Sequence, residues 1–308
     1  MTGSHFQESG SGPALVVGGD SLVGAAIQRH CHELGVPVAI SSRRPGTTNI
    51  FLDLGDPDFS PLERTRYAYA FICAGVTDMR ACQNEPAATR RINVVNTIEL
   101  MCRLADRGAH LVFFSTSQVF DGETPAPAED AVTSPKNEYG AQKLAVEQEI
   151  ARRELSAAIL RPTKILAKHP VGVFKAWFEA LAKGNAIQAA TNMALSPVLV
   201  GDVAEAAGRL AAGGHRGIWH LGARDEMSYF DAARLMADMQ HLSPALVKGE
   251  ALTDAQVPSI YRHRHATLSS EKTARTLAMP LRRARDVLEE VFAGFAQPVA
   301  GPRRLSGV

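Results

Sequence analysis

The hydrophobic positions in the first half of the chain fall into short, unbroken runs separated by longer stretches of helical period. The runs predict strands over residues 14–17, 36–40, 69–73, 111–114 and 157–160. Apolar positions spaced three and four apart predict helices over residues 23–34, 86–107 and 138–154. Continuous apolar strands that alternate with helices are typical of a parallel sheet covered on both faces. The pattern therefore predicts an α/β fold built on a doubly wound sheet.

The pattern changes after Arg161-Pro162-Thr163. Residues 172–183 predict an amphipathic helix, in which Trp177 and Phe178 are expected to pack in a core rather than line a pocket. Residues 196–214 predict a strand followed by a helix, and residues 217–223 predict another strand. We therefore expect a nucleotide-binding sheet domain over residues 13–165, with returning segments near 197–222. A smaller, interwoven C-terminal substrate lobe would comprise residues 166–196 and 223–308.

Composition narrows the classes of function. A formal net charge of +1, with no basic run among aromatics, argues against a nucleic-acid partner or a charged membrane surface. No apolar stretch approaches the roughly 20 residues of a membrane span, and residues 1–12 form a polar tail expected to be flexible. The four cysteines lack pair spacing and no histidine pair has metal-ligand spacing, so we predict free thiols and no metal. We expect a cytoplasmic protein that acts on a small molecule, as a monomer or a homodimer.

A glycine-rich turn joins the first predicted strand to the first helix. Such a turn lets the backbone approach a dinucleotide pyrophosphate at the positive end of the helix. A plain strand-turn-helix is the alternative. Ser21 stands where extended dehydrogenases carry their middle glycine, and we expect its hydroxyl to donate to a phosphate. The predicted cofactor residues of this turn are Gly18, Ser21, Leu22, Val23 and Gly24.

The end of the second predicted strand carries no carboxylate for a ribose. It carries Ser42, Arg43 and Arg44 instead, which suit the 2′-phosphate of NADPH through charge-assisted hydrogen bonds. A solvated basic turn is the alternative, with NADH as the cofactor. Three further positions complete the predicted cofactor site: Asp53 for the adenine, and Ala74 and Gly75 for close backbone approach.

Three hydroxyl residues follow the strand at 111–114, and Tyr139 and Lys143 lie one turn apart on the next helix. A tyrosine has an ordinary pKa of about 10, and a neighbouring ammonium together with an oxidised nicotinamide favours the phenolate. The hypothesis is that hydride passes from nicotinamide to a carbonyl carbon while Tyr139 protonates the oxygen. Lys143 would bind ribose and lower the pKa of Tyr139, and Thr116 would orient the substrate. The alternative is an ordinary exposed helix pair.

Several motifs carry a family resemblance. STSQVFDG resembles Ser-Thr-Asp-Tyr-Val-Phe-Asp-Gly, and SPKNEYGAQK resembles Pro-x-Asn-x-Tyr-Gly-x-x-Lys. The chain thereby resembles the extended short-chain dehydrogenase/reductase family, in its dTDP-4-dehydrorhamnose reductase (sugar-nucleotide reductase) branch. The resemblance implies a Rossmann domain, an NAD(P)H cofactor and a nucleotide-sugar substrate held over the C-terminal lobe. It also implies that Thr116, Tyr139 and Lys143 are catalytic, and that Asn93 helps to hold the cofactor site.

Two positions depart from that branch. Ser117 stands at its aspartate and Gln118 at its tyrosine, so the identity of the sugar stays open. Both residues are candidate substrate contacts, and Asn192 is a third by analogy. The segment 262–265 (RHRH) predicts either a diphosphate clamp or a basic loop.

The predicted function is NADPH-dependent reduction of a keto-sugar nucleotide. One alternative is an epimerase on the same scaffold. The other is a non-catalytic NADP-binding subunit, like the regulatory subunit of methionine adenosyltransferase.

Overall fold

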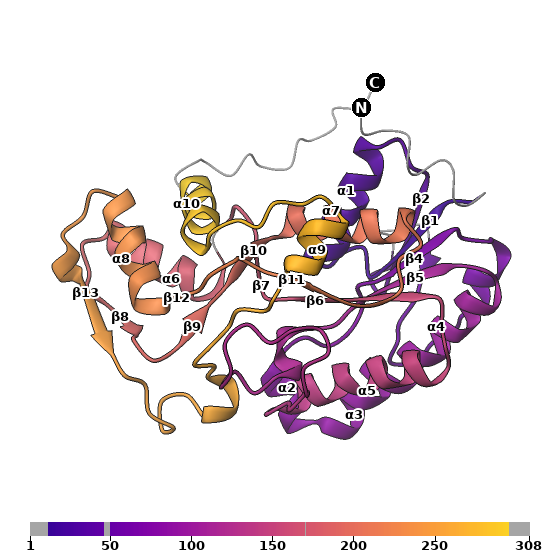
Figure 1. The fold of residues 1–308 in the computed structure, drawn as a ribbon, viewed down its shortest axis with the longest axis horizontal. Coiled ribbons are helices and arrows are strands. Elements are labelled where there is room, and N and C mark those ends of the chain that lie inside the picture. Colours follow the sequence, from indigo (N-terminus) through magenta and orange to yellow (C-terminus); the bar gives the residue numbers. More distant parts are fainter. Residues whose placement is uncertain (1–11, 46–49, 170, 296–308) are drawn as a thin grey trace.

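A computed structural model describes residues 12–45, 50–169 and 171–295. The predicted tail, except for Gly12, and the last residues of the predicted lobe lie outside the described residues. The core of the molecule is a parallel sheet of seven strands in the order β11-β6-β5-β4-β1-β2-β3 (Figure 1). Its strands are β1 (Ala14–Val17), β2 (Val38–Ser42), β3 (Ile50–Phe51), β4 (Tyr69–Ile72), β5 (His110–Phe114), β6 (Ala157–Pro162) and β11 (Gly217–Leu221). The predicted doubly wound α/β fold is confirmed.

Helices cover both faces of this sheet because its central strands are apolar on both sides (Figure 1). Helices α1 (Leu22–Glu33) and α7 (Val200–Ala212) bury one face, and α4 (Thr97–Asp106) and α5 (Glu138–Arg152) bury the other. The predicted helix at 86–107 runs from α3 (Pro86–Arg90) through a π-helical turn (Arg91–Asn96) into α4. Such turns in a helix frequently occur at functional sites.

The smaller lobe has its own apolar core and lies at one end of the molecule (Figure 1). Trp177 is buried in this core, 5.6 Å from Phe174 and 6.2 Å from Tyr229 between ring centroids, so the expected packing role is confirmed. The helices of the lobe are α6 (Gly172–Ala182), α8 (Tyr229–Met239) and α10 (Ala284–Phe295). Its strands pair as β8 (Ile187–Ala190) with β13 (Val247–Glu250), and β9 (Ala194–Leu195) with β12 (Met227–Ser228).

The chain crosses between sheet and lobe several times. The predicted strand at the start of 196–214 is β10 (Pro197–Leu199), which pairs with β7 (Lys164–Leu166) outside the seven-stranded sheet. After α7 the chain returns as β11, which pairs with β6 at the edge of that sheet. The remaining elements are α2 (Met79–Asn84), α9 (Glu271–Thr276) and single 3-10 turns at Ser60–Arg64, Ser117–Val119, Pro244–Leu246 and Ser259–Tyr261. In the described part of the chain, no helix combines the length and apolar character that crossing a membrane requires.

Candidate active site

A cavity of about 470 Å³ lies where the parallel strands end. This is the edge at which open α/β sheets hold their ligands. One wall comes from the start of α1 and the ends of β4 and β5, and the other comes from residues 193–195, 229, 261, 263 and 266 of the lobe. We call these the sheet wall and the lobe wall. Thr116, Tyr139 and Lys143 all line the cavity, so the three predicted catalytic residues are brought together.

Helix α5 positions Tyr139 and Lys143. Asn137 caps the helix, because its Oδ1 accepts a hydrogen bond from the Gly140 N–H at 2.9 Å. Tyr139 follows in the first turn, and the buried Lys143 lies one turn later with its Nζ 6.0 Å from the centroid of the tyrosine ring. The Lys143 Nζ donates a hydrogen bond to the Phe114 carbonyl oxygen at 2.8 Å, which attaches α5 to the end of β5.

Burial governs the ionisation of this pair. It raises the pKa of Tyr139 to about 12 and lowers the pKa of Lys143 to about 8, because a desolvated site disfavours both charged forms. A hydrogen bond with Thr116 acts in the opposite direction on the pKa of Tyr139. For the protein alone, burial keeps the pKa of Tyr139 above its ordinary value. The predicted lowering requires the oxidised nicotinamide beside the Lys143 ammonium, and it stays a prediction.

The three hydroxyl residues after β5 point to different partners. Ser115 donates its hydroxyl hydrogen to the carboxylate of Glu147, inside the sheet domain. Thr116 begins a 3-10 turn, and its Oγ1 accepts a hydrogen bond from the Gln118 N–H at 3.2 Å. Ser117 and Gln118 line the cavity, as predicted for substrate contacts. The hydroxyl of Ser115 thus bonds within the sheet domain, whereas Thr116 and Ser117 line the cavity without such a bond to Glu147.

A buried ionic network behind Tyr139 and Lys143 was not predicted. Glu147 and Arg161 are 4% and 2% exposed, and Arg161 Nη2 lies 2.5 Å from Glu147 Oε2. Arg161 Nη1 is 3.3 Å from Nε2 of His220, whose pKa burial and the guanidinium lower to about 3. The available signals were a lone arginine in an apolar strand and a glutamate four residues after Lys143, on the same helix face.

The glycine turn is closely packed. A Cβ on Gly24 would lie 2.3 Å from the Gly18 carbonyl oxygen, and Gly18 itself has a φ of +85°. The Ser21 Oγ caps α1 by accepting from the Gly24 N–H at 3.0 Å, and it donates to the Gly18 carbonyl at 2.7 Å. Its one hydroxyl hydrogen is therefore already used, and the expected donation from Ser21 to a phosphate is not supported.

The backbone of the next two residues stays available instead. Leu22 and Val23 line the cavity, and their N–H groups make no hydrogen bond within the described ranges. The first amides of a helix have no partner inside the helix, and they attract anions. Of the predicted turn, Ser21, Leu22 and Val23 thus line the cavity.

The residues predicted for the 2′-phosphate and the adenine lie beyond the cavity lining. Ser42 is buried, and its Oγ accepts from the Arg44 N–H at 3.0 Å, so its hydroxyl supports the turn. Arg44 is exposed and reaches back to the glycine turn, with its Nε 3.1 Å from Oδ2 of Asp20; Arg43 is exposed beside it. The Asp53 carboxylate caps its own turn by accepting from the Gly55 N–H at 2.8 Å.

The loop after β4 is held by Asn93. Its Oδ1 accepts from the Val76 N–H at 2.7 Å, while its Nδ2 donates to the Gln142 side chain at 2.7 Å. A Cβ on Gly75 would lie 3.0 Å from that Oδ1, so Gly75 lets the two segments approach. Ala74 packs close to Gly18 in the same way. Asn93 therefore positions the loop against α5, and its amide is already occupied by protein partners.

The lobe wall differs most from expectation. Asn192 lies outside the cavity and is tied to Leu252, whose N–H and carbonyl each lie 2.9 Å from its amide. The predicted substrate contact at Asn192 is therefore not supported. The lobe-wall residues that were not predicted include Met193, Tyr229 and Tyr261.

The segment 262–265 does not form a clamp. Arg262 bonds to the Leu252 carbonyl at 2.7 Å and to Asp254. Arg264 is exposed away from this cavity, and His265 Nδ1 lies 2.7 Å from the Glu226 carboxylate. Of these four residues only His263 lines the cavity.

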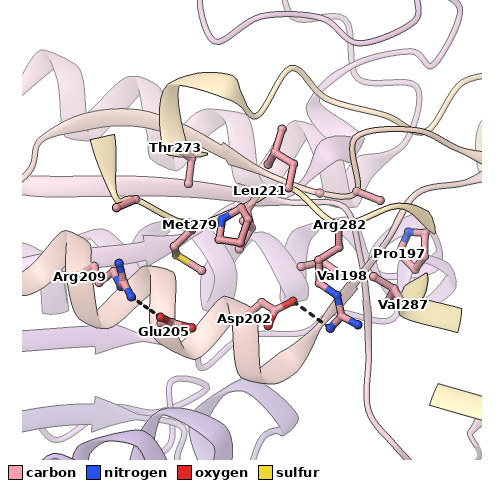
Figure 2. Close-up of a pocket in the computed structure, with 15 residues that line it drawn as sticks. Pro197, Val198, Asp202, Glu205, Arg209, Leu221, Thr273, Met279, Arg282 and Val287 are labelled. Carbon is pink, nitrogen blue, oxygen red and sulfur yellow. Dashed lines mark hydrogen bonds and ion pairs between the residues drawn. The ribbon is translucent and has the colours of Figure 1, made fainter. Parts of the chain in front are cut away.

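A second cavity, of about 160 Å³, lies between α7 and the segment 278–287 (Figure 2). It shares no lining residue with the first. Its charged groups are paired with one another, Arg209 with Glu205 at 2.5 Å and Arg282 with Asp202 at 3.8 Å (Figure 2). The predicted catalytic residues Thr116, Tyr139 and Lys143 line the first cavity and not this one. Within the described ranges, no group of three or more histidine, cysteine, aspartate or glutamate side chains is placed to hold a metal ion.

Comparison with known proteins identifies the family of this chain. Residues 13–297 match the family described as RmlD substrate binding domain. The chain belongs to this family. It is 30% identical over 241 residues to dTDP-4-dehydrorhamnose reductase of Mycobacterium tuberculosis (strain H37Rv), covering 76% of this chain and 79% of the relative. The RmlD family is a sugar-nucleotide reductase branch of the extended short-chain dehydrogenase/reductases, a class of NAD(P)-dependent oxidoreductases.

This RmlD-family chain is also similar to a second curated relative and to a solved structure. The methionine adenosyltransferase 2 subunit beta of Mus musculus is 27% identical over 212 residues, covering 65% of this chain and 62% of the relative. A dTDP-4-dehydrorhamnose reductase from Bacillus anthracis, solved in complex with NADP, superposes with a TM-score of 0.81 at 19% identity, covering 92% of this chain and 99% of that chain. The second likeness establishes the fold.

Proposed function

We propose that this protein reduces a nucleotide-linked keto sugar with NADPH, with Tyr139 as the proton donor. The observation that carries the proposal is the meeting of Thr116, Tyr139 and Lys143 with the first turn of α1 in one cavity. The sheet domain would hold the cofactor and the lobe would hold the sugar nucleotide. Family membership supports the same reaction class.

The glycine turn fits a dinucleotide. Leu22 and Val23 line the cavity at the positive end of α1, and their N–H groups bond to none of the described residues. A pyrophosphate there would be stabilised by the backbone and the helix dipole. Arg43 and Arg44 stand near this turn, because Arg44 pairs with Asp20. Both guanidinium groups suit the 2′-phosphate of NADPH. Bound NADPH supplies the hydride.

The chain's own residues supply the proton and the orientation. Tyr139, whose pKa burial raises to about 12, is protonated at neutral pH and can donate its proton to a developing alkoxide. Thr116 would hydrogen-bond the same oxygen from the end of β5. The Lys143 ammonium would bind ribose hydroxyls and favour the phenolate once the proton has left. Its link to the Phe114 carbonyl holds the ammonium beside the tyrosine.

The test is to mix the protein with NADPH and a panel of nucleotide-linked 4-keto-6-deoxysugars, and to follow the loss of reduced-nicotinamide absorbance. Tyr139→Phe should lower kcat by about 10²–10⁴, the usual contribution of a positioned acid, with little change in the Kd of NADPH. Product analysis separates reduction from epimerisation, since an epimerase leaves the nicotinamide oxidation state unchanged. Full activity in Tyr139→Phe would refute the role of the tyrosine.

A second candidate is a non-catalytic, NADP-binding subunit, favoured by the similarity to methionine adenosyltransferase 2 subunit beta. The complete catalytic set in the cavity argues against it, since a scaffold has no need of a phenol next to a buried ammonium. A stoichiometric enzyme partner captured from native extract, together with NADPH binding but no turnover, would favour this candidate.

A further inference from the structure

We propose that His263 is a specificity-determining residue that hydrogen-bonds a hydroxyl of the sugar. This inference rests on the proposed function, because it names how that same cavity selects its substrate. It assigns to the lobe wall a neutral polar contact that neither the family match nor the relatives specify.

The observation is a buried polar atom without a partner. His263 is 8% exposed and lines the 470 Å³ cavity as well as a small adjoining pocket of about 10 Å³. Its Nε2 makes no hydrogen bond to any residue that the structure describes. Most buried polar atoms are hydrogen-bonded, because a buried polar atom without a partner destabilises the protein. A substrate hydroxyl in the cavity would supply the hydrogen-bond partner that Nε2 of His263 lacks.

The imidazole is held in place from several sides. Gly122 has a φ of +73° and packs directly on the ring, where a Cβ would lie 2.7 Å from Nδ1. The His263 carbonyl accepts from the Ala194 N–H at 3.1 Å, and the His265 N–H donates to the Gly122 carbonyl at 2.8 Å. A ring fixed in this way is preorganised, so little conformational freedom is lost when a ligand binds.

The charge state suits a hydroxyl. Burial, and to a lesser extent the charge of Lys136, lower the pKa of His263, and the carboxylates of Asp121 and Glu123 oppose this only in part. The ring is therefore neutral at pH 7 and offers one donor and one acceptor. A neutral imidazole pairs well with a sugar hydroxyl, whereas a diphosphate favours a charged partner.

Ser117 strengthens the assignment. It lines both the cavity and the small pocket, as His263 does. Ser117 stands at the aspartate of the resembled branch, so this position carries a neutral group instead of a charged one beside the small pocket that it shares with His263. The small pocket has room for about one water at most, so an ordered water is the competing partner of Nε2.

The experiment pairs His263→Leu, which removes the hydrogen bond, with His263→Gln, which retains a donor and an acceptor. Each is measured with the best nucleotide-linked keto sugar of the panel and with analogues that lack one ring hydroxyl. We expect His263→Leu to raise KM about 10- to 100-fold with kcat little changed, and His263→Gln to recover most of the loss. With the analogue that lacks the contacted hydroxyl, wild type and His263→Leu should have the same KM. His32→Leu, at an exposed histidine of α1, is the matched control.

The outcomes are distinguishable. If wild type reduces no sugar nucleotide, the proposed function fails and this inference fails with it. If wild type is active and His263→Leu keeps its KM, the inference alone is overturned and Nε2 bonds to water. Equal KM penalties on all analogues, with a lowered Tm in both variants, would assign His263 to structure and also overturn it. Binding is checked independently from the ¹⁵N chemical shift of the His263 imidazole, which should move when a nucleoside-diphosphate 6-deoxysugar is added.

Discussion

The two walls of the cavity are built in different ways. The sheet wall is held by buried groups with several bonds each, such as Asn93 at the loop after β4 and Glu147 behind Lys143. The lobe wall is formed by short segments, namely β9, the start of α8 and the loop that carries His263, whose Nε2 makes no hydrogen bond to the described residues. We therefore expect changes under the sheet wall to affect the proposed chemistry and cofactor binding most, and changes in the lobe wall to affect the choice of substrate.

The first way to test this comparison is to break the network under the sheet wall. Glu147→Gln leaves the buried Arg161 without its countercharge, and breaking a buried ion pair costs about 3–5 kcal/mol of unfolding free energy. Urea unfolding measures the loss. Glu149→Gln, at the partly exposed partner of Arg152 and Arg153 on the same helix, should change stability far less. Equal losses would show that the network does not stabilise this wall.

The glycine turn provides a second test of the sheet wall. In Gly24→Ala the new methyl group meets the Gly18 carbonyl, so the turn must shift. We expect the Kd of NADPH to rise about 30-fold, which corresponds to about 2 kcal/mol. Gly201→Ala in α7 has open space around the new methyl group and is the matched control. Calorimetric titration that gave both variants the wild-type Kd would contradict a tightly packed turn.

Protonation of His220, which belongs to the network under the sheet wall, should lower the free energy of unfolding in acid. Its pKa is about 3 in the folded protein and about 6.5 when unfolded, so between these values the unfolded chain binds the extra proton. Stability therefore falls as the pH drops below 6.5, by about 2 kcal/mol from pH 7 to pH 5. The unfolding free energy of His220→Leu should depend less on pH over that window. Parallel pH profiles for the two proteins would rule out His220 as the source.

A smaller effect is expected at the exposed rim beyond the sheet wall. Replacing Arg43 and Arg44 together by alanine should weaken NADPH about tenfold more than NADH, because only NADPH carries the 2′-phosphate. Arg275→Ala, on exposed α9, serves as the control. Equal losses of both cofactors would contradict the 2′-phosphate assignment.

The smallest effect is expected at Asn192 in the lobe. Asn192→Ala removes two bonds to Leu252 outside the cavity, so kcat and KM for the sugar nucleotide should stay within about twofold of wild type, well under 1 kcal/mol. Steady-state kinetics measures this directly. A large rise in KM would indicate that Asn192 contacts the substrate, and it would contradict the difference between the two walls.

The sheet wall was easier to predict from the sequence than the lobe wall. Turn geometry and helix spacing are local properties of the chain. The sequence alone therefore singles out Gly18, Gly24, Tyr139 and Lys143. Ser21 was misjudged because the sequence does not tell which oxygen receives its hydroxyl hydrogen. The effect of burial on the pKa of Tyr139 was not predicted, because burial depends on segments far away in the sequence.

The lobe wall was hardest to predict. Asn192 and His263 sit in loops whose positions depend on contacts with Leu252 and Gly122, respectively. Such long-range contacts leave no periodic signal in the sequence.

The return of the chain to the sheet has a consequence for folding and engineering. β11 completes the sheet edge only after the chain has passed through part of the lobe, and it is followed by more of the lobe. Neither half is a continuous stretch, so a chain truncated near residue 165 would lack both α7 and the edge strand. Assembly requires pairing between segments distant in sequence, which slows folding. We therefore expect one cooperative melting transition, and insertions or new termini to be tolerated better in exposed loops than between the two halves.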